Sequence, residues 1–125
     1  MSKYFTEKEL KCKCGKCTSI PMDKDFLEKM DKLREICGFP FRVTSAYRCP
    51  NYNKVISSSG LNGPHTTGKA MDIYLDGQQC YQVLREAMKL GFTGIGVKQK
   101  GYSRFLHLDT LQKDHLHERP IVWSY

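Results

Sequence analysis

The chain has 125 residues, of which 40% are hydrophobic and 26% charged, as expected for one domain with a single core, spanning residues 1–125. No apolar run approaches the ~20 residues that a membrane span needs, and the first ten residues lack the apolar stretch of a secretory signal. The net charge of +7 favours an anionic partner, but no nucleic-acid-binding motif accompanies the scattered lysines, so no specific nucleic-acid partner is predicted.

The N-terminal half is expected to form helices at residues 5–10, 23–37 and 51–56 and a strand at residues 41–45. Thr6 and Glu9 have the spacing of a capping box at the start of the first helix. In residues 23–37 apolar side chains recur every three or four positions, and Gly38 ends the pattern, which is typical of an amphipathic helix. The Ser- and Gly-rich residues 57–64 are expected to form a loop.

The C-terminal half is expected to place strands at residues 71–75, 94–97 and 104–109 and a second long helix at residues 78–90. Side chains alternate along a strand, so His107 and Asp109 should point to one face while Leu106 and Leu108 enter the core. Two helices packed on one face of a small, mostly antiparallel sheet would make an α+β domain. The Cys-rich residues 1–20 should pack on it, and the open sheet face should hold a cleft.

Three side chains are candidate metal ligands: His65, Asp72 and His107. A lone aspartate inside an apolar strand is costly to bury unless a cation compensates its charge, and Asp72 is such a residue. The small Gly68 and Ala70 would let the loop after His65 turn sharply towards that strand. Imidazole and carboxylate are ligands of hydrolytic zinc, and three of them leave a fourth position for water.

The six cysteines fall into two groups. Cys37 and Cys80 lie at apolar helix positions and are expected in the core. Cys12, Cys14 and Cys17 are closely spaced, and three interpretations remain open for them. With Cys49 they could bind a second metal ion, they could form a disulfide such as Cys12 with Cys49, or they could stay reduced.

The order and spacing of several motifs over nearly the whole chain resemble those of one peptidase family. The motifs are Ser45-Ala-Tyr47-Arg48-Cys49-Pro50, His65-x-x-Gly68-x-Ala70-x-Asp72-Ile73, Gly94-Ile95-Gly96, Phe105-x-His107-x-Asp109 and the closing Arg119-Pro120-Ile-Val-Trp123. The chain is similar in these motifs to the zinc D-alanyl-D-alanine carboxypeptidase and phage L-alanyl-D-glutamate endopeptidase family. The hedgehog signalling domain shares the fold of that family.

The resemblance implies zinc held by His65, Asp72 and His107, and Arg48 gripping a substrate carboxylate or the oxyanion. It suggests Asp109 as the general base, or alternatively as the partner that orients an imidazole. Two departures concern the positions just before the ligands. Arg104 stands three residues before His107, where related enzymes carry a catalytic acid, and Gly63-Pro64 precedes His65 in place of a Ser two residues ahead. A His115-x-His117 pair is an alternative source of the last ligand.

The resemblance further implies a zinc peptidase of the α+β, hedgehog-like fold that cleaves stem or cross-link peptides of peptidoglycan. A monomer is expected, although the sequence does not determine the oligomeric state. It would be made in the bacterial cytoplasm and act at the cell wall, in phage lysis or as part of a virion. Which peptide bond is cut, and whether the source is viral or bacterial, stay open. The alternatives are a catalytically inactive zinc-containing module that binds the wall or a peptide, and a basic zinc protein that binds nucleic acid through residues 12–17.

Overall fold

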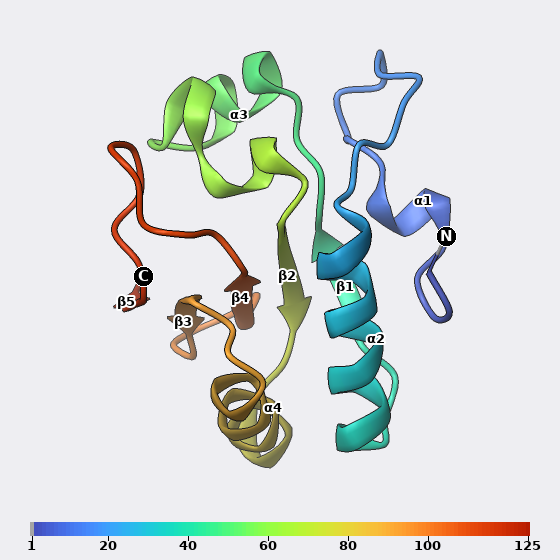
Figure 1. Cartoon of the computed structure of the whole chain (residues 1–125), viewed down its shortest axis with the longest axis vertical. Coiled ribbons are helices and arrows are strands. Elements are labelled where there is room, and N and C mark those ends of the chain that lie inside the picture. Colours follow the sequence, from blue (N-terminus) through green and yellow to red (C-terminus); the bar gives the residue numbers. More distant parts are fainter. Residues whose placement is uncertain (1) are drawn as a thin grey trace.

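The computed structural model describes residues 2–125 and consists of a five-stranded sheet with helices around it (Figure 1). The strand order is β1-β2-β4-β3-β5, and all neighbouring pairs are antiparallel except the parallel pair of β3 and β5. The strands are β1 (Arg42–Ser45), β2 (Ala70–Tyr74), β3 (Gly94–Lys98), β4 (Phe105–Asp109) and β5 (Ile121–Ser124). The helices are α1 (Glu7–Leu10), α2 (Lys24–Cys37), α3 (Pro50–Ile56) and α4 (Gly77–Lys89), with 3₁₀ turns η1 (Gly60–Asn62) and η2 (Pro64–Thr67).

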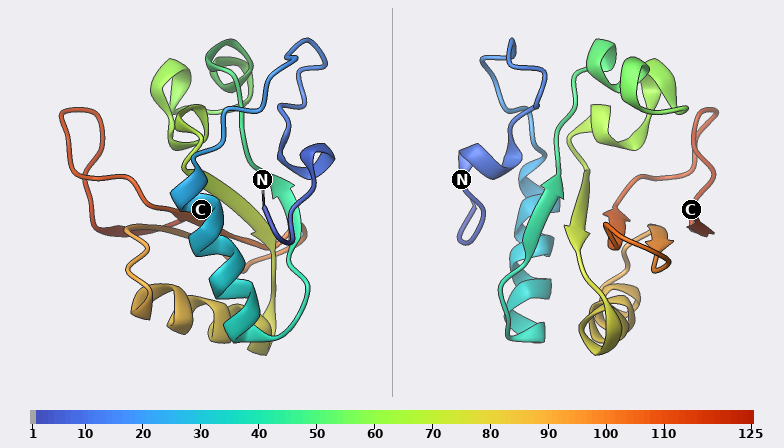
Figure 2. Two further views of the ribbon diagram at one scale, coloured as in Figure 1. Left: turned by 45° about the vertical axis from the view of Figure 1, so that its right-hand side comes forward. Right: turned by 180° about the vertical axis from the view of Figure 1, so that it is seen from behind.

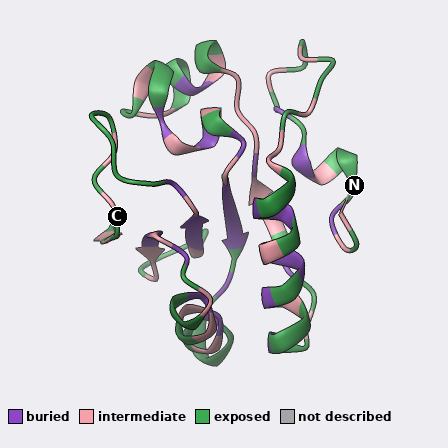
Figure 3. Cartoon of the chain, in the orientation of Figure 1, coloured by how far each residue is buried: buried purple, intermediate pink, exposed green. Residues whose placement is uncertain are grey.

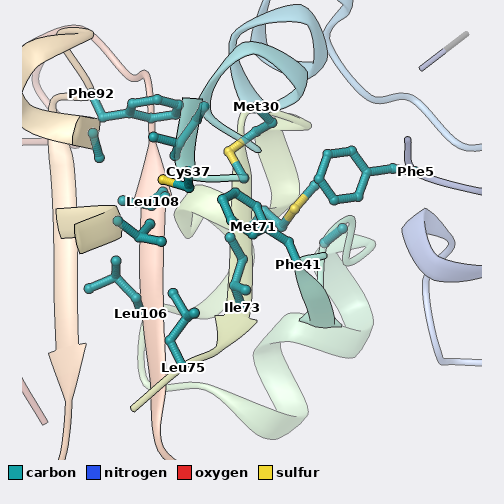
Figure 4. Packing of buried hydrophobic residues seen from close by; sticks show 14 of the residues in the cluster. Phe5, Met30, Cys37, Phe41, Met71, Ile73, Leu75, Phe92, Leu106 and Leu108 are labelled. Atoms are coloured by element: carbon teal, nitrogen blue, oxygen red, sulfur yellow. The ribbon is translucent and has the colours of Figure 1, made fainter. Parts of the chain in front are cut away.

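The two long helices, α2 and α4, cover one face of the sheet (Figure 2). Between them and the strands lies the hydrophobic core, to which Met30, Met71, Ile73, Leu106 and Leu108 contribute fully buried side chains (Figure 4). The central strands β2 and β4 are buried over most of their length, whereas α2 alternates between buried and exposed positions (Figure 3). The prediction of an α+β domain with helices on one face of a mostly antiparallel sheet is confirmed.

Local signals in the sequence explain where the helices begin and end. The Asp23 carboxylate accepts a hydrogen bond from the Phe26 amide at the start of α2, and Gly38 ends that helix in the left-handed conformation at φ +80°. Thr6 and Glu9 form the capping box predicted for α1. Of the described helices, none combines the length and apolar character required to cross a bilayer.

Two segments differ from the prediction. The expected loop of residues 57–64 contains the η1 turn and the beginning of η2, and Ile121–Ser124 forms the edge strand β5, which was not predicted. Its four residues are partly or fully exposed and are ordered by pairing with β3. Because that pairing joins segments far apart in the sequence, no local sequence pattern predicted the strand.

Candidate metal centre and its cleft

The sheet register brings two of the three candidate ligands together. Asp72 in β2 lies directly opposite His107 in β4, so both side chains project from the same face of the sheet, away from the core helices. Leu106 and Leu108 alternate to the other face and are fully buried in the core, as predicted. Alternate side chains of β4 therefore belong to the core and to the site.

His65 reaches the same point from the η2 turn, which precedes β2. The turn ends at Gly68 in the left-handed conformation, φ +76°, and a Cβ on this residue would lie 2.0 Å from the carbonyl oxygen of Pro21. Only glycine fits this close approach of two backbones. The Arg48 amide donates to the His65 carbonyl oxygen at 3.1 Å, which ties η2 to the segment after β1.

The ligand atoms of His65, Asp72 and His107 all lie within 4.8 Å of one another, and all three residues are buried. The Asp72 Oδ1 atom is 3.2 Å from His65 Nε2 and 3.0 Å from His107 Nδ1. One carboxylate oxygen thus faces two imidazole nitrogens. These are the three residues that the sequence motifs predicted as zinc ligands, and the assignment of zinc to them stays a proposal.

On each imidazole ring, the nitrogen that faces away from Asp72 has a hydrogen-bond acceptor, and this decides which nitrogen carries the proton. His65 Nδ1 lies 2.6 Å from the Ala46 carbonyl oxygen and His107 Nε2 lies 2.8 Å from Asp109 Oδ2, so both of these nitrogens donate to acceptors. In the neutral rings the remaining nitrogens carry lone pairs, and both point at the ionised carboxylate of Asp72. Three acceptors that converge in a buried space require a positive charge between them, either a metal ion or protons on the rings.

Asp109 is fully buried and holds His107 in place. Arg119 grips both of its carboxylate oxygens, with Nε 3.0 Å from Oδ1 and Nη2 2.8 Å from Oδ2, and the Leu111 amide donates to Oδ1 at 3.2 Å. Burial alone would raise the pKa of Asp109, but the hydrogen bonds from His107 and Arg119 outweigh it and lower the pKa to about 2. In metal sites, an ionised carboxylate hydrogen-bonded to a ligand imidazole orients the ring and increases its basicity, and Asp109 is placed to act on His107 in this way.

The Arg48 guanidinium lies beside the ligands and is itself held from two sides. Its Nε donates to the Ser45 hydroxyl at 2.9 Å and its Nη1 donates to the Asn53 amide oxygen at 3.2 Å, while Nη2 lies 3.6 Å from Asp72 Oδ2. A bulge between Val43 and Ser45 turns the end of β1 towards the site. Arg48 is therefore fixed where it can contact a bound anionic group.

A cleft of about 470 Å³ opens over the three candidate ligands. Arg48 and residues 56–59 line one part of it, and aromatic side chains line another: Phe105, Trp123 and Tyr125. The Trp123 ring packs on His107 with centroids 4.9 Å apart. A Cβ on Gly96 would lie 2.6 Å from Trp123 Nε1, so this glycine makes room for the indole.

The site contains residues to which sequence analysis assigned no role. Arg119, Trp123 and Asn53 support or line it, although Arg119 and Trp123 belong to the closing segment noted for its resemblance. By contrast, the alternative pair is not part of the cluster: His115 is exposed, and His117 Nε2 bonds to the Asn62 carbonyl oxygen at 2.9 Å. Arg104 takes the position at which the resemblance would place a catalytic acid, and its Nε donates to the Gly101 carbonyl oxygen.

Metal and protons should compete for this site. Burial alone lowers the pKa of His107, but its hydrogen bonds with Asp109 and Asp72 raise the pKa above the ordinary value of 6.5. In metal-free protein this group therefore stabilises the fold below pH ~6.5 and loses that contribution as pH rises through its raised pKa. A metal needs the neutral ring, so the rise in melting temperature caused by zinc should grow as the pH rises above about 6.5 and through the raised pKa of His107.

Thermal unfolding with and without a chelator across this pH range measures the effect. Asp109→Asn serves as the control, because it removes one of the two carboxylates that raise the pKa of His107 and should shift the increase to lower pH. A zinc effect that does not vary with pH, or that is unchanged in Asp109→Asn, would contradict the expectation.

Comparison with known protein families identifies the family of the chain. The family described as Peptidase M15 matches residues 3–109. The chain therefore belongs to the peptidase M15 family, as the motifs indicated. This membership supports a hydrolase that acts on peptide bonds. A comparison with curated proteins found no match.

Proposed function

We propose that the protein is a zinc-dependent peptidase that hydrolyses stem or cross-link peptides of bacterial peptidoglycan. The observation that carries the proposal is the convergence of one ionised carboxylate and two imidazole lone pairs within 4.8 Å at the bottom of a cleft. These ligand types fit zinc, and the cleft leaves room for a water molecule and a substrate. His65, Asp72 and His107 would hold the ion.

Zinc bound at such a site lowers the pKa of water to near neutrality and polarises a carbonyl group. The protein supplies the remaining contributions. Arg48 donates to the oxygen that becomes negative, and Asp109 keeps His107 in the tautomer that presents Nδ1 to the cleft. Asp109 or a neighbour was the candidate from the sequence for the group that carries the proton to the leaving amine, but the burial of Asp109 and its bonds with His107 and Arg119 favour the orienting role.

The choice of substrate rests on charge and on the motifs that resemble the wall peptidases. Peptidoglycan peptides carry free carboxylates, and Arg48 lines the cleft of a chain whose net charge is +7. A planar guanidinium held by Ser45 and Asn53 can bind a carboxylate with two parallel hydrogen bonds. We propose that the protein acts as a monomer at the cell wall, during phage lysis or from a virion.

One observation favours a second candidate, a zinc-containing module that binds wall peptides without cleaving them. Among the described residues that line the cleft, Asp72 is the sole carboxylate, and it is occupied as a proposed ligand. Arg104 stands where related enzymes carry an acid. The two candidates predict the same metal content and the same wall binding, but different chemistry.

Metal removal separates the candidates. Purified peptidoglycan is incubated with the protein, and newly exposed amino groups and fragment masses are recorded. The peptidase should release fragments, stop when a chelator removes zinc and recover when zinc is restored. The fragment masses also identify the bond that is cut. Zinc-dependent sedimentation with the wall but no new amino groups would overturn the peptidase and favour the binding module.

A further inference from the structure

Four of the six cysteines meet at a second place, away from the cleft. Cys12, Cys14 and Cys17 lie in the N-terminal loop and Cys49 directly precedes α3, and Figure 2 shows this loop beside the start of that helix. Their four sulfur atoms all lie within 4.8 Å of one another. We propose that these cysteines bind a second, structural zinc ion. The proposal is independent of the peptidase function, because it uses none of the cleft ligands.

The spacing of the sulfurs fits ligation of a common ion. In a tetrahedral site with zinc–sulfur bonds of about 2.3 Å the sulfurs are about 3.8 Å apart, whereas a disulfide bond is about 2.05 Å long. The Cys14 and Cys17 sulfurs are 3.4 Å apart, close to the first value. The Cys14-x-x-Cys17 spacing is also that of structural zinc sites.

Backbone geometry prepares the sulfurs to act as thiolates. The Lys16 amide donates to Cys14 Sγ and the Cys49 amide donates to Cys12 Sγ, each at 3.3 Å. Between Cys14 and Lys16 the chain turns at Gly15 with φ +78°, a conformation that suits glycine. Donors aimed at sulfur stabilise its negative charge, and a metal ligand must carry that charge.

Their position outside the core cluster and the charge around them distinguish these cysteines from the others. Cys37 and Cys80 belong to the hydrophobic core, where a thiol serves as an apolar side chain. The four clustered cysteines are not part of that core cluster. Cys12 is buried beside it, whereas Cys14, Cys17 and Cys49 are partly exposed. Four thiolates around one Zn²⁺ leave a net negative charge. The same segment carries three lysines that offset it: Lys11, Lys13 and Lys16.

The position of the cluster gives the ion a structural role. It would join the N-terminal loop to Cys49, whose neighbour Arg48 lines the cleft. Residues 46–49 already contact both the N-terminal segment and a candidate cleft ligand. The Tyr47 amide donates to the Leu10 carbonyl oxygen, and the Ala46 carbonyl oxygen accepts from His65. A surface hollow of about 570 Å³, bordered by Cys14, Cys17 and Cys49, gives an ion access from solvent.

Zinc content of purified variants tests the proposal. Wild type should hold about two zinc ions per chain, and Cys14→Ser and Cys17→Ser should each hold about one. His65→Ala should also fall to about one by losing the other ion, and Cys14→Ser with His65→Ala should hold none. Cys80→Ala is the matched control, which should keep both ions. If Cys14→Ser and Cys17→Ser keep the wild-type zinc content and only His65→Ala loses zinc, the cleft site is supported and the cysteine site is overturned.

A measurement on wild type keeps the test valid even where a variant does not fold. Protein loaded with Co²⁺ should show the intense near-ultraviolet charge-transfer absorption of cobalt–thiolate bonds. Its mass under denaturing, non-reducing conditions should correspond to six free thiols. A mass lower by the two hydrogens that each disulfide bond removes from a pair of thiols would overturn the proposal. Cobalt loading without thiolate absorption would overturn it as well.

Discussion

Asp72→Ala is expected to lower peptide hydrolysis by more than about 100-fold, the upper end of the loss seen when a partner behind a metal ligand is removed. Asp72 is central because its Oδ1 atom lies within 3.2 Å of both candidate imidazole nitrogens. Removing it deletes one ligand and the negative charge that attracts the ion. Zinc content should fall together with the rate, and both are measured on protein whose fold is checked by circular dichroism.

Two controls make this result specific to the metal centre. Asp76→Ala removes an exposed aspartate at the start of α4 that makes no side-chain cap hydrogen bond, and it should leave rate and zinc unchanged. His65→Ala with Asp72→Ala should lose no more activity than either single change, because residues that hold one ion act as a unit. A folded Asp72→Ala protein that degrades peptidoglycan at the wild-type rate would exclude this site.

Arg119→Met is expected to lower the free energy of unfolding by about 3 kcal/mol, as when one partner of a buried ion pair is removed. The Asp109 carboxylate would keep its contacts with His107 and Leu111 but lose both charge-assisted bonds from the guanidinium. A less firmly oriented His107 should also weaken zinc binding by about 10- to 100-fold. Chemical denaturation and zinc titration measure the two effects.

The matched control is Arg85→Met, because Arg85 forms an ion pair with Glu86 on the surface with its side chain 52% exposed. Such pairs contribute less than about 1 kcal/mol. Arg119→Lys should fall between wild type and Arg119→Met, since an ammonium group cannot bond both carboxylate oxygens in the same planar fashion. Equal stability of Arg119→Met and Arg85→Met would show that the buried pair does not anchor the site.

Asp109→Asn distinguishes the two roles considered for this residue. An orienting role predicts weaker zinc binding and a kcat that recovers when zinc is saturating. A role as general base predicts a kcat that stays lower by about 100-fold or more at saturating zinc. The geometry favours the orienting role, because Asp109 is fully buried and its oxygens are engaged by His107, Arg119 and the Leu111 amide.

Much of the fold follows from local patterns. The three- and four-residue apolar spacing in α2 and its Gly38 stop predicted the helix correctly, because a helix must bury one stripe and end where the backbone can turn. Alternation in β4 correctly separated Leu106 and Leu108 from His107. Strand β5 was not predicted because Ile121–Ser124 shows no alternation of apolar and polar residues in the sequence and is ordered by pairing with β3.

The sequence alone determined which residues are able to do chemistry: the imidazoles, carboxylates and thiols, and the strand faces on which some of them lie. Tertiary structure decided which of them meet. The register of β2 against β4 sets Asp72 opposite His107, the turn at Gly68 delivers His65, and Arg119 returns from ten residues away to hold Asp109. The physical reason is that a side chain's face is a local property of the strand. A distance between strands depends instead on pairing, which the whole core stabilises.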